Sequence, residues 1–135
     1  MFYEATFISF GMQKYGIKHF SYGCIAESGK NSATLHYEDN YEIIENNSLV
    51  LLDMGCAISQ YVYDITITIP ENGKYSATQQ NVYNGVLKAI RMVKSKLKTG
   101  IEWPKKHMLA EEIILESFKE IGLAKEMQKK WLKKE

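Results

Sequence analysis

The chain has 135 residues and a formal net charge of +1, with 45% apolar and 24% charged residues. This composition is typical of a single globular domain and excludes collagen-like, proline-rich and disordered chains. No apolar run approaches the ~18 residues that a membrane helix needs, no secretory leader is recognisable, and two cysteines cannot form a disulfide framework. We therefore expect a cytoplasmic protein with no membrane partner.

Charge is distributed unevenly along the chain, since residues 1–70 carry −5 and residues 71–135 carry +6. A basic half can indicate nucleic-acid binding. Here, however, cations recur at the spacing of a solvated helix face, at Lys88, Arg91, Lys94 and Lys98. We expect no nucleic-acid partner. The acidic first half is more informative, because carboxylates that cannot be solvated often hold metal ions.

The first half of the chain predicts one helix and four strands, over residues 2–15, 22–26, 33–37, 49–52 and 61–69. Four consecutive apolar residues at 49–52 are typical of a strand that is buried on both faces. In the last strand, three isoleucines alternate with polar residues, which gives the strand one apolar and one polar face.

The second half predicts two helices and a lysine-rich helical tail over residues 125–135. Ser76 and Gln79 fit a capping box at the start of the first helix, whose apolar face continues to Leu97. Pro104 fits the first turn of the second helix, which extends to Ile121. A helix, several strands and two helices in this order predict an α+β fold with mainly antiparallel pairing.

Asp53 and Asp64 are the candidate metal ligands. Eleven positions and a glycine-containing reversal separate them, so a hairpin would direct both carboxylates into one space. Two adjacent carboxylates need a compensating cation, and oxygen ligands suit Mn, Co, Zn or Mg equally well. The spacing alone leaves a second interpretation open, in which Asp53 caps the turn and Asp64 pairs with a lysine.

Three sequence blocks occur in order: LHY at residues 35–37, LLDMG at 51–55, and DITITIP followed by NGK at 64–74. In these blocks the chain resembles the catalytic domain of Xaa-Pro aminopeptidases and Xaa-Pro dipeptidases, which are pita-bread metallopeptidases. The resemblance extends over about residues 4–124. It implies the first half of the pita-bread fold, an antiparallel sheet with packed helices, as a single partial catalytic domain over residues 1–135.

The resemblance also implies a site with five ligands and two divalent ions, most often manganese, with cobalt or zinc as alternatives. By residue-for-residue match, Asp53 would chelate one ion and Asp64 would bridge both. His36, in the LHY block, would lie beside the metals and contact the substrate, a peptide with proline in second position. The implied reaction is hydrolysis of the N-terminal Xaa-Pro bond by a metal-activated water.

Three of the five ligands of this family have no counterpart here, namely the histidine of an HGxGH-type segment and two later glutamates. His19 and His107 match no ligand, and Ile67 replaces an arginine that is usual in the family. We therefore expect weak or no metal binding and no activity from this chain alone. We also expect a homo-oligomer or a missing C-terminal half. The alternative is a non-catalytic half-domain, pseudoenzyme or split-gene fragment that acts only as a scaffold or binding module.

Overall fold

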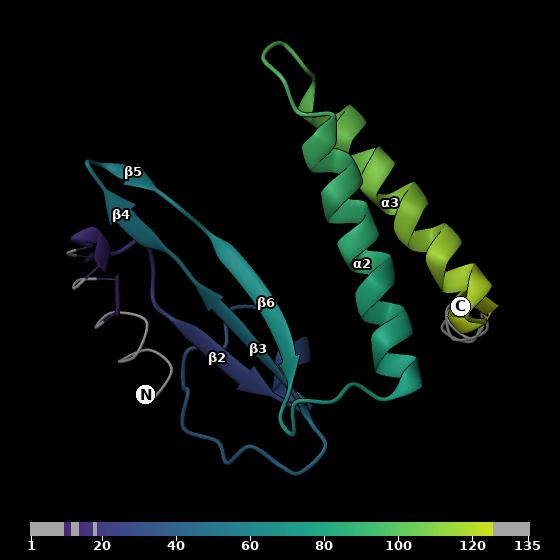
Figure 1. Ribbon diagram of the computed structural model, residues 1–135, viewed down its shortest axis with the longest axis horizontal. Helices are drawn as coiled ribbons and strands as arrows, with labels where there is room; N and C mark the ends of the chain where they lie inside the picture. The colour runs from purple at the N-terminus through teal and green to yellow at the C-terminus, as the bar shows by residue number, and fades with distance from the viewer. Residues whose placement is uncertain (1–9, 12–13, 18, 126–135) are drawn as a thin grey trace, which may run out of the picture. The chain divides into compact units, whose positions relative to one another are not determined.

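The computed structural model describes residues 10–11, 14–17 and 19–125, and it divides into two compact units with the boundary between Lys74 and Tyr75. The first unit is built of strands and the second of two helices (Figure 1). Of the helix predicted over residues 2–15, the described part, at residues 10–11 and 14–15, is helical. The rest of that helix, and the tail beyond residue 125, lie outside the described residues.

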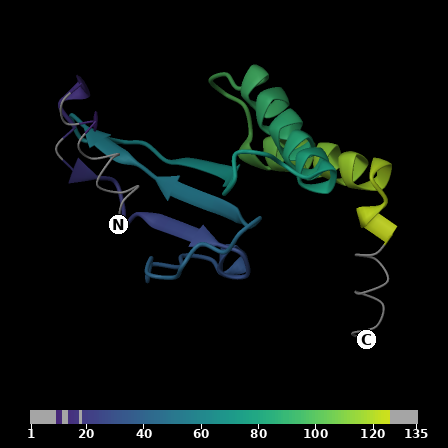
Figure 2. The ribbon, with the colours of Figure 1, turned by 60° about the horizontal axis from the view of Figure 1, so that its bottom comes forward.

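A three-stranded antiparallel sheet forms the centre of the first unit. It consists of β2 (Ile25–Ser28), β3 (Leu49–Met54) and β6 (Ile65–Pro70), with β3 in the middle (Figures 1 and 2). The strand predicted over residues 49–52 is thus confirmed and extends through Asp53. The strand predicted over residues 22–26 begins three residues later than expected.

The register of the sheet places its acidic side chains on one face. Ile25 lies opposite Asp53, and Asp53 lies opposite Thr66. Because side chains alternate along each strand, this face, called here the carboxylate face, also carries Glu27. The opposite face carries Val50 and Leu52, which are only 2% and 4% exposed and form the core of this unit.

A second ladder continues from the end of β3 and consists of β1 (His19–Phe20), β4 (Cys56–Ile58) and β5 (Tyr61–Val62). Gly55 joins β3 to β4 at a point with no room for a side chain. A Cβ atom there would lie 1.9 Å from the Tyr63 carbonyl oxygen and 2.6 Å from Ser21 Oγ. The backbone therefore requires glycine at this crossing.

Two strand predictions were wrong in part or whole. The strand predicted over residues 61–69 is divided into β5 and β6, and Asp64 lies in the break rather than inside a strand. At the break, the Tyr63 carbonyl accepts a hydrogen bond from Ser21 Oγ at 2.6 Å, while the Tyr63 N–H still donates to the Cys56 carbonyl at 3.0 Å.

The strand predicted over residues 33–37 is absent. The chain there forms a 3₁₀ turn, η1 (Asn31–Ala33), and then reverses at His36, whose φ is 56°. The edge of β2 is instead occupied by the side chain of Asn40, which accepts from Ala26 N–H at 2.6 Å and donates to the Cys24 carbonyl at 2.7 Å. A single amide therefore replaces part of the predicted strand.

The second unit is a hairpin of α2 (Ala77–Ser95) and α3 (Trp103–Glu120), which lie side by side (Figure 1). The capping box is confirmed: Ser76 Oγ accepts from Gln79 N–H, and Gln79 Oε1 accepts from Ser76 N–H. Helix α2 ends two residues before the predicted Leu97. Gly85 is buried against Ser117, so the helices approach closely where glycine leaves space.

Candidate metal centre

Tyr22 joins the two predicted metal ligands. Its hydroxyl lies 2.5 Å from Oδ1 of Asp53 and 3.1 Å from Oδ1 of Asp64. The two carboxylates therefore converge on a single atom. Asp53 is held by β3 on the carboxylate face, and Asp64 is exposed just before β6. The second interpretation of the spacing paired Asp64 with a lysine. Among the described residues, however, no lysine forms an ion pair with either aspartate.

The electrostatics of this cluster favour an added cation. A phenol hydroxyl has one proton, so Tyr22 cannot donate fully to both carboxylates. Burial, followed by the hydrogen bonds to Asp53 and Asp64, raises the pKa of Tyr22 well above its usual 10.0, so the phenol stays protonated at neutral pH. The two carboxylates still repel each other, and a positive ion would relieve that repulsion.

The donor chemistry fits part of a metal site. Carboxylate oxygens are hard ligands that suit manganese, magnesium or zinc. Among the residues that the structure describes, no group of three or more His, Cys, Asp or Glu side chains is arranged to hold an ion. Asp53 and Asp64 thus form a cluster of two carboxylates.

His36 lies in the exposed turn after η1, and within the described ranges no residue forms a hydrogen bond or ion pair with its imidazole. The structure therefore does not link this ring to either aspartate directly.

Two residues near Asp53 and Asp64 were not predicted from the sequence. Tyr22 was assigned to an apolar strand, and its partners are 31 and 42 positions away, so no local pattern indicated it. Glu27 is 4% exposed, and its Oε2 has no hydrogen-bond partner among the described residues. Burial and the nearby charge of Asp53 raise the pKa of Glu27, while the Tyr37 N–H opposes this rise. The one feature of the sequence that could have indicated Glu27 is an acidic residue within a short strand of small and apolar residues.

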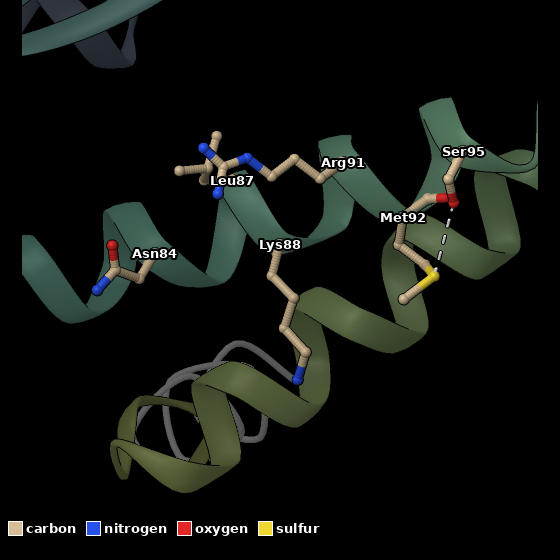
Figure 3. A pocket seen from close by; sticks show the side chains of 6 residues that line it. All are labelled: Asn84, Leu87, Lys88, Arg91, Met92 and Ser95. Carbon is tan, nitrogen blue, oxygen red and sulfur yellow. Dashed lines mark hydrogen bonds between the residues drawn. The ribbon is translucent and has the colours of Figure 1, made fainter.

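A shallow hollow on α2 is a poor candidate for the site. Figure 3 shows the six side chains that line it, all from this one helix: Asn84, Leu87, Lys88, Arg91, Met92 and Ser95. None of them carries a carboxylate, and the hollow includes neither Asp53 nor Asp64. The convergent carboxylates therefore remain the stronger candidate.

Comparison with known proteins agrees with the geometry. Residues 3–130 match metallopeptidase family M24. The chain belongs to this family. It is 40% identical over 124 residues to human Xaa-Pro dipeptidase, a match that covers 89% of this chain and 25% of that protein. The M24 chain thus spans about a quarter of the length of the curated relatives it matches.

Solved structures of aminopeptidase P share the fold of this M24 chain. A structure from Bacillus anthracis assigned as an aminopeptidase P superposes with a TM-score of 0.80 at 40% identity, covering 89% of this chain and 28% of that one. Zinc-substituted Escherichia coli aminopeptidase P in complex with product gives 0.80 at 28% identity, covering 90% and 28%. The α+β, pita-bread prediction is confirmed. Within the described part of the chain, no helix is long and apolar enough to cross a membrane.

Proposed function

We propose that this chain contributes part of the metal site of a peptidase that hydrolyses an N-terminal Xaa-Pro bond. The observation that carries the proposal is the convergence of Asp53 and Asp64 on the Tyr22 hydroxyl. The relatives support the proposal, because the chain belongs to a metallopeptidase family and is 40% identical to an Xaa-Pro dipeptidase. The substrate would be a peptide with proline in second position.

Each site residue has a proposed role. Asp53 and Asp64 would hold divalent ions, manganese first and cobalt or zinc as alternatives, with Asp64 shared between two ions. The chemistry that such ions supply is activation of a water and stabilisation of negative charge on the scissile carbonyl oxygen. Tyr22 holds the two carboxylates at one point through its hydroxyl. His36 would contact and orient the peptide.

We further propose that residues 1–135 act as one part of a larger catalytic domain. Two carboxylates supply too few ligands for tight binding, so this chain alone would bind metal weakly and would not turn over substrate. Neither Cys24 nor Cys56 is in a disulfide, which suits a reducing compartment, and we propose that the protein is cytoplasmic.

Calorimetric titration with Mn²⁺, Co²⁺ and Zn²⁺ tests the metal site. We expect wild type to bind at roughly micromolar affinity or weaker. Asp53→Asn and Asp64→Asn should each weaken binding at least about tenfold, because each removes a charged oxygen ligand. Asp39→Asn, which changes an aspartate outside the cluster, is the matched control and should bind as wild type does.

Two results would contradict this assignment. Binding that is equal in wild type and Asp53→Asn would show that the ion sits elsewhere. Stoichiometric binding of two ions by wild type would show that the ligand set is more complete than proposed. An absence of binding by wild type would favour the non-catalytic scaffold.

A further inference from the structure

We propose that Ser21 is a positioning residue for Asp64, because its hydroxyl fixes the peptide group that precedes this carboxylate. Ser21 Oγ donates to the Tyr63 carbonyl at 2.6 Å, and that carbonyl belongs to the peptide bond between Tyr63 and Asp64. The proposed ligand set gives Ser21 no role. The inference rests on the proposed function only in treating Asp64 as a metal ligand, whereas the position of the carboxylate can be measured without metal.

Asp64 depends on such a contact because it lies between the two ladders. The pairing of β4 with β5 ends two residues before it, and the pairing of β3 with β6 begins one residue after it. In this break, the Tyr63 N–H donates to the Cys56 carbonyl at 3.0 Å, and the Tyr63 carbonyl accepts from the Ser21 hydroxyl. Asp64 itself is exposed, so burial does little to hold its side chain. The two bonds of Tyr63 therefore fix the backbone directly before Asp64.

The segment formed by residues 21 and 22 also contacts the strand that carries the other carboxylate. The Ser21 N–H donates to the carbonyl of Gly55 at 3.1 Å, two residues after Asp53. The hydroxyl of the next residue, Tyr22, lies 2.5 Å from Asp53 Oδ1 and 3.1 Å from Asp64 Oδ1. Residues 21 and 22 thus link the two carboxylate-bearing segments through the backbone as well as through side chains.

A hydroxyl at position 21 supplies what an apolar side chain of similar size would not. Ser21 Oγ would lie 2.6 Å from a Cβ atom added at Gly55, so this hydroxyl occupies the narrow crossing where the two ladders meet. An alanine would fit the same space but would leave the Tyr63 carbonyl without this donor. The peptide before Asp64 would then be free to rotate and to carry Oδ1 away from the Tyr22 hydroxyl. Displacing a ligand lowers metal affinity even when both carboxylates are still present.

Nuclear Overhauser spectroscopy of the metal-free 135-residue chain tests the position of Asp64. In wild type, the Tyr22 ring protons should show cross-peaks to the β protons of both Asp53 and Asp64. In Ser21→Ala the Asp64 cross-peak should be lost while the Asp53 cross-peak persists, whereas a general loss of structure would remove both. Ser21→Thr, which keeps a hydroxyl, should retain the Asp64 cross-peak.

Ser48→Ala is the matched control. It removes a hydroxyl that donates to a backbone carbonyl, that of Glu45, at 2.7 Å, and it lies at the opposite end of β3 from Asp53. This variant should keep both cross-peaks. Retention of both cross-peaks in Ser21→Ala would overturn the positioning role, as would a wild type without the Asp64 cross-peak. If Ser21→Ala fails to fold, Ser21→Cys decides, because a thiol is a weak donor and should also lose the Asp64 cross-peak.

Titration with Mn²⁺ separates this inference from the proposed metal site. Ser21→Ala should weaken Mn²⁺ binding by up to about tenfold, and Ser21→Thr should restore most of the affinity. In an Asp64→Asn background, Ser21→Ala should cost little, because its effect passes through the carboxylate that is already removed. An equal cost in both backgrounds would contradict positioning through Asp64. An absence of Mn²⁺ binding by wild type would count against the proposed metal site, and the cross-peaks would still decide whether Ser21 positions Asp64.

Discussion

A single tyrosine hydroxyl organises the candidate site. Tyr22 lies between β1 and β2, and it contacts one carboxylate on β3 and another just before β6. In the absence of a cation, this hydroxyl is the donor that offsets the repulsion between Asp53 and Asp64. The contribution of this hydroxyl can therefore be measured as a change in the free energy of unfolding, without an activity assay.

Tyr22→Phe should lower the free energy of unfolding by about 1 to 2 kcal/mol, because the two carboxylates lose their common donor. Urea denaturation without metal measures the loss. Tyr61→Phe, at a tyrosine that is 74% exposed, is the matched control and should change little. In an Asp53→Asn background the cost of Tyr22→Phe should shrink. Equal costs in the two backgrounds would show that the hydroxyl does not act through Asp53.

Glu27 should make stability fall as pH rises. Burial, together with the charge of Asp53, raises its folded-state pKa above the ordinary 4.5, so the folded state holds this proton more tightly than the unfolded state. The stabilising contribution is complete below pH 4.5 and is lost as pH rises through the folded value. Urea denaturation at several pH values should therefore show Glu27→Gln gaining stability relative to wild type with increasing pH. Parallel stability curves for the two proteins would contradict this.

The sequence predicted the two aspartates but not the residue that joins them. Asp53 ends an apolar run, so its position follows from a local pattern. Asp64 was predicted inside an alternating strand, and it lies instead in the break before β6. Tyr22 reaches them only through the fold, and its neighbours in sequence look like strand residues. The unpartnered oxygen of Glu27 likewise depends on burial that no local pattern specifies.

At the scale of elements, Gly55 determines how the two ladders join. A Cβ atom added at Gly55 would lie 1.9 Å from the Tyr63 carbonyl oxygen and 2.7 Å from the Tyr22 ring. The same crossing divides the strand predicted over residues 61–69. Periodicity alone indicated a continuous strand there, because alternation describes which face a residue occupies and not whether the ladder is interrupted.

Gly55→Ala should destabilise the first unit by about 2 to 4 kcal/mol, since a backbone oxygen must move to admit the methyl group. It should also displace Tyr22 and weaken Mn²⁺ binding. Gly23→Ala is the matched control, because its Cβ would approach nothing closer than 3.7 Å. We expect that control to stay within about 0.5 kcal/mol of wild type. Thermal denaturation, monitored by circular dichroism, compares the two variants. Equal melting temperatures would contradict the steric argument.

At the scale of the whole molecule, β6 forms one edge of the three-stranded sheet and carries exposed apolar side chains. Ile65 is 63% exposed and Ile67 is 47% exposed. Edge strands with apolar surface favour pairing with another chain. We therefore expect the 135-residue chain to associate with a second copy of itself along this strand.

Light scattering of the isolated chain tests the association. Wild type should have at least the mass of a dimer, and the combined change Ile65→Thr and Ile67→Thr should shift it toward the monomer while retaining strand propensity. Leu35→Thr, at an exposed leucine outside the sheet, should leave the mass unchanged. A strictly monomeric wild type would be incompatible with this expectation.

The amide of Asn40 has a consequence for aggregation. By occupying Ala26 N–H and the Cys24 carbonyl, it removes from the outer edge of β2 the groups that an incoming strand would use first. A single side chain therefore blocks the outer edge of β2, whereas no strand among the described residues pairs with the outer side of β6. A chain with one blocked edge can form closed pairs but cannot propagate the same pairing into a fibril, because stacking without limit needs two available edges.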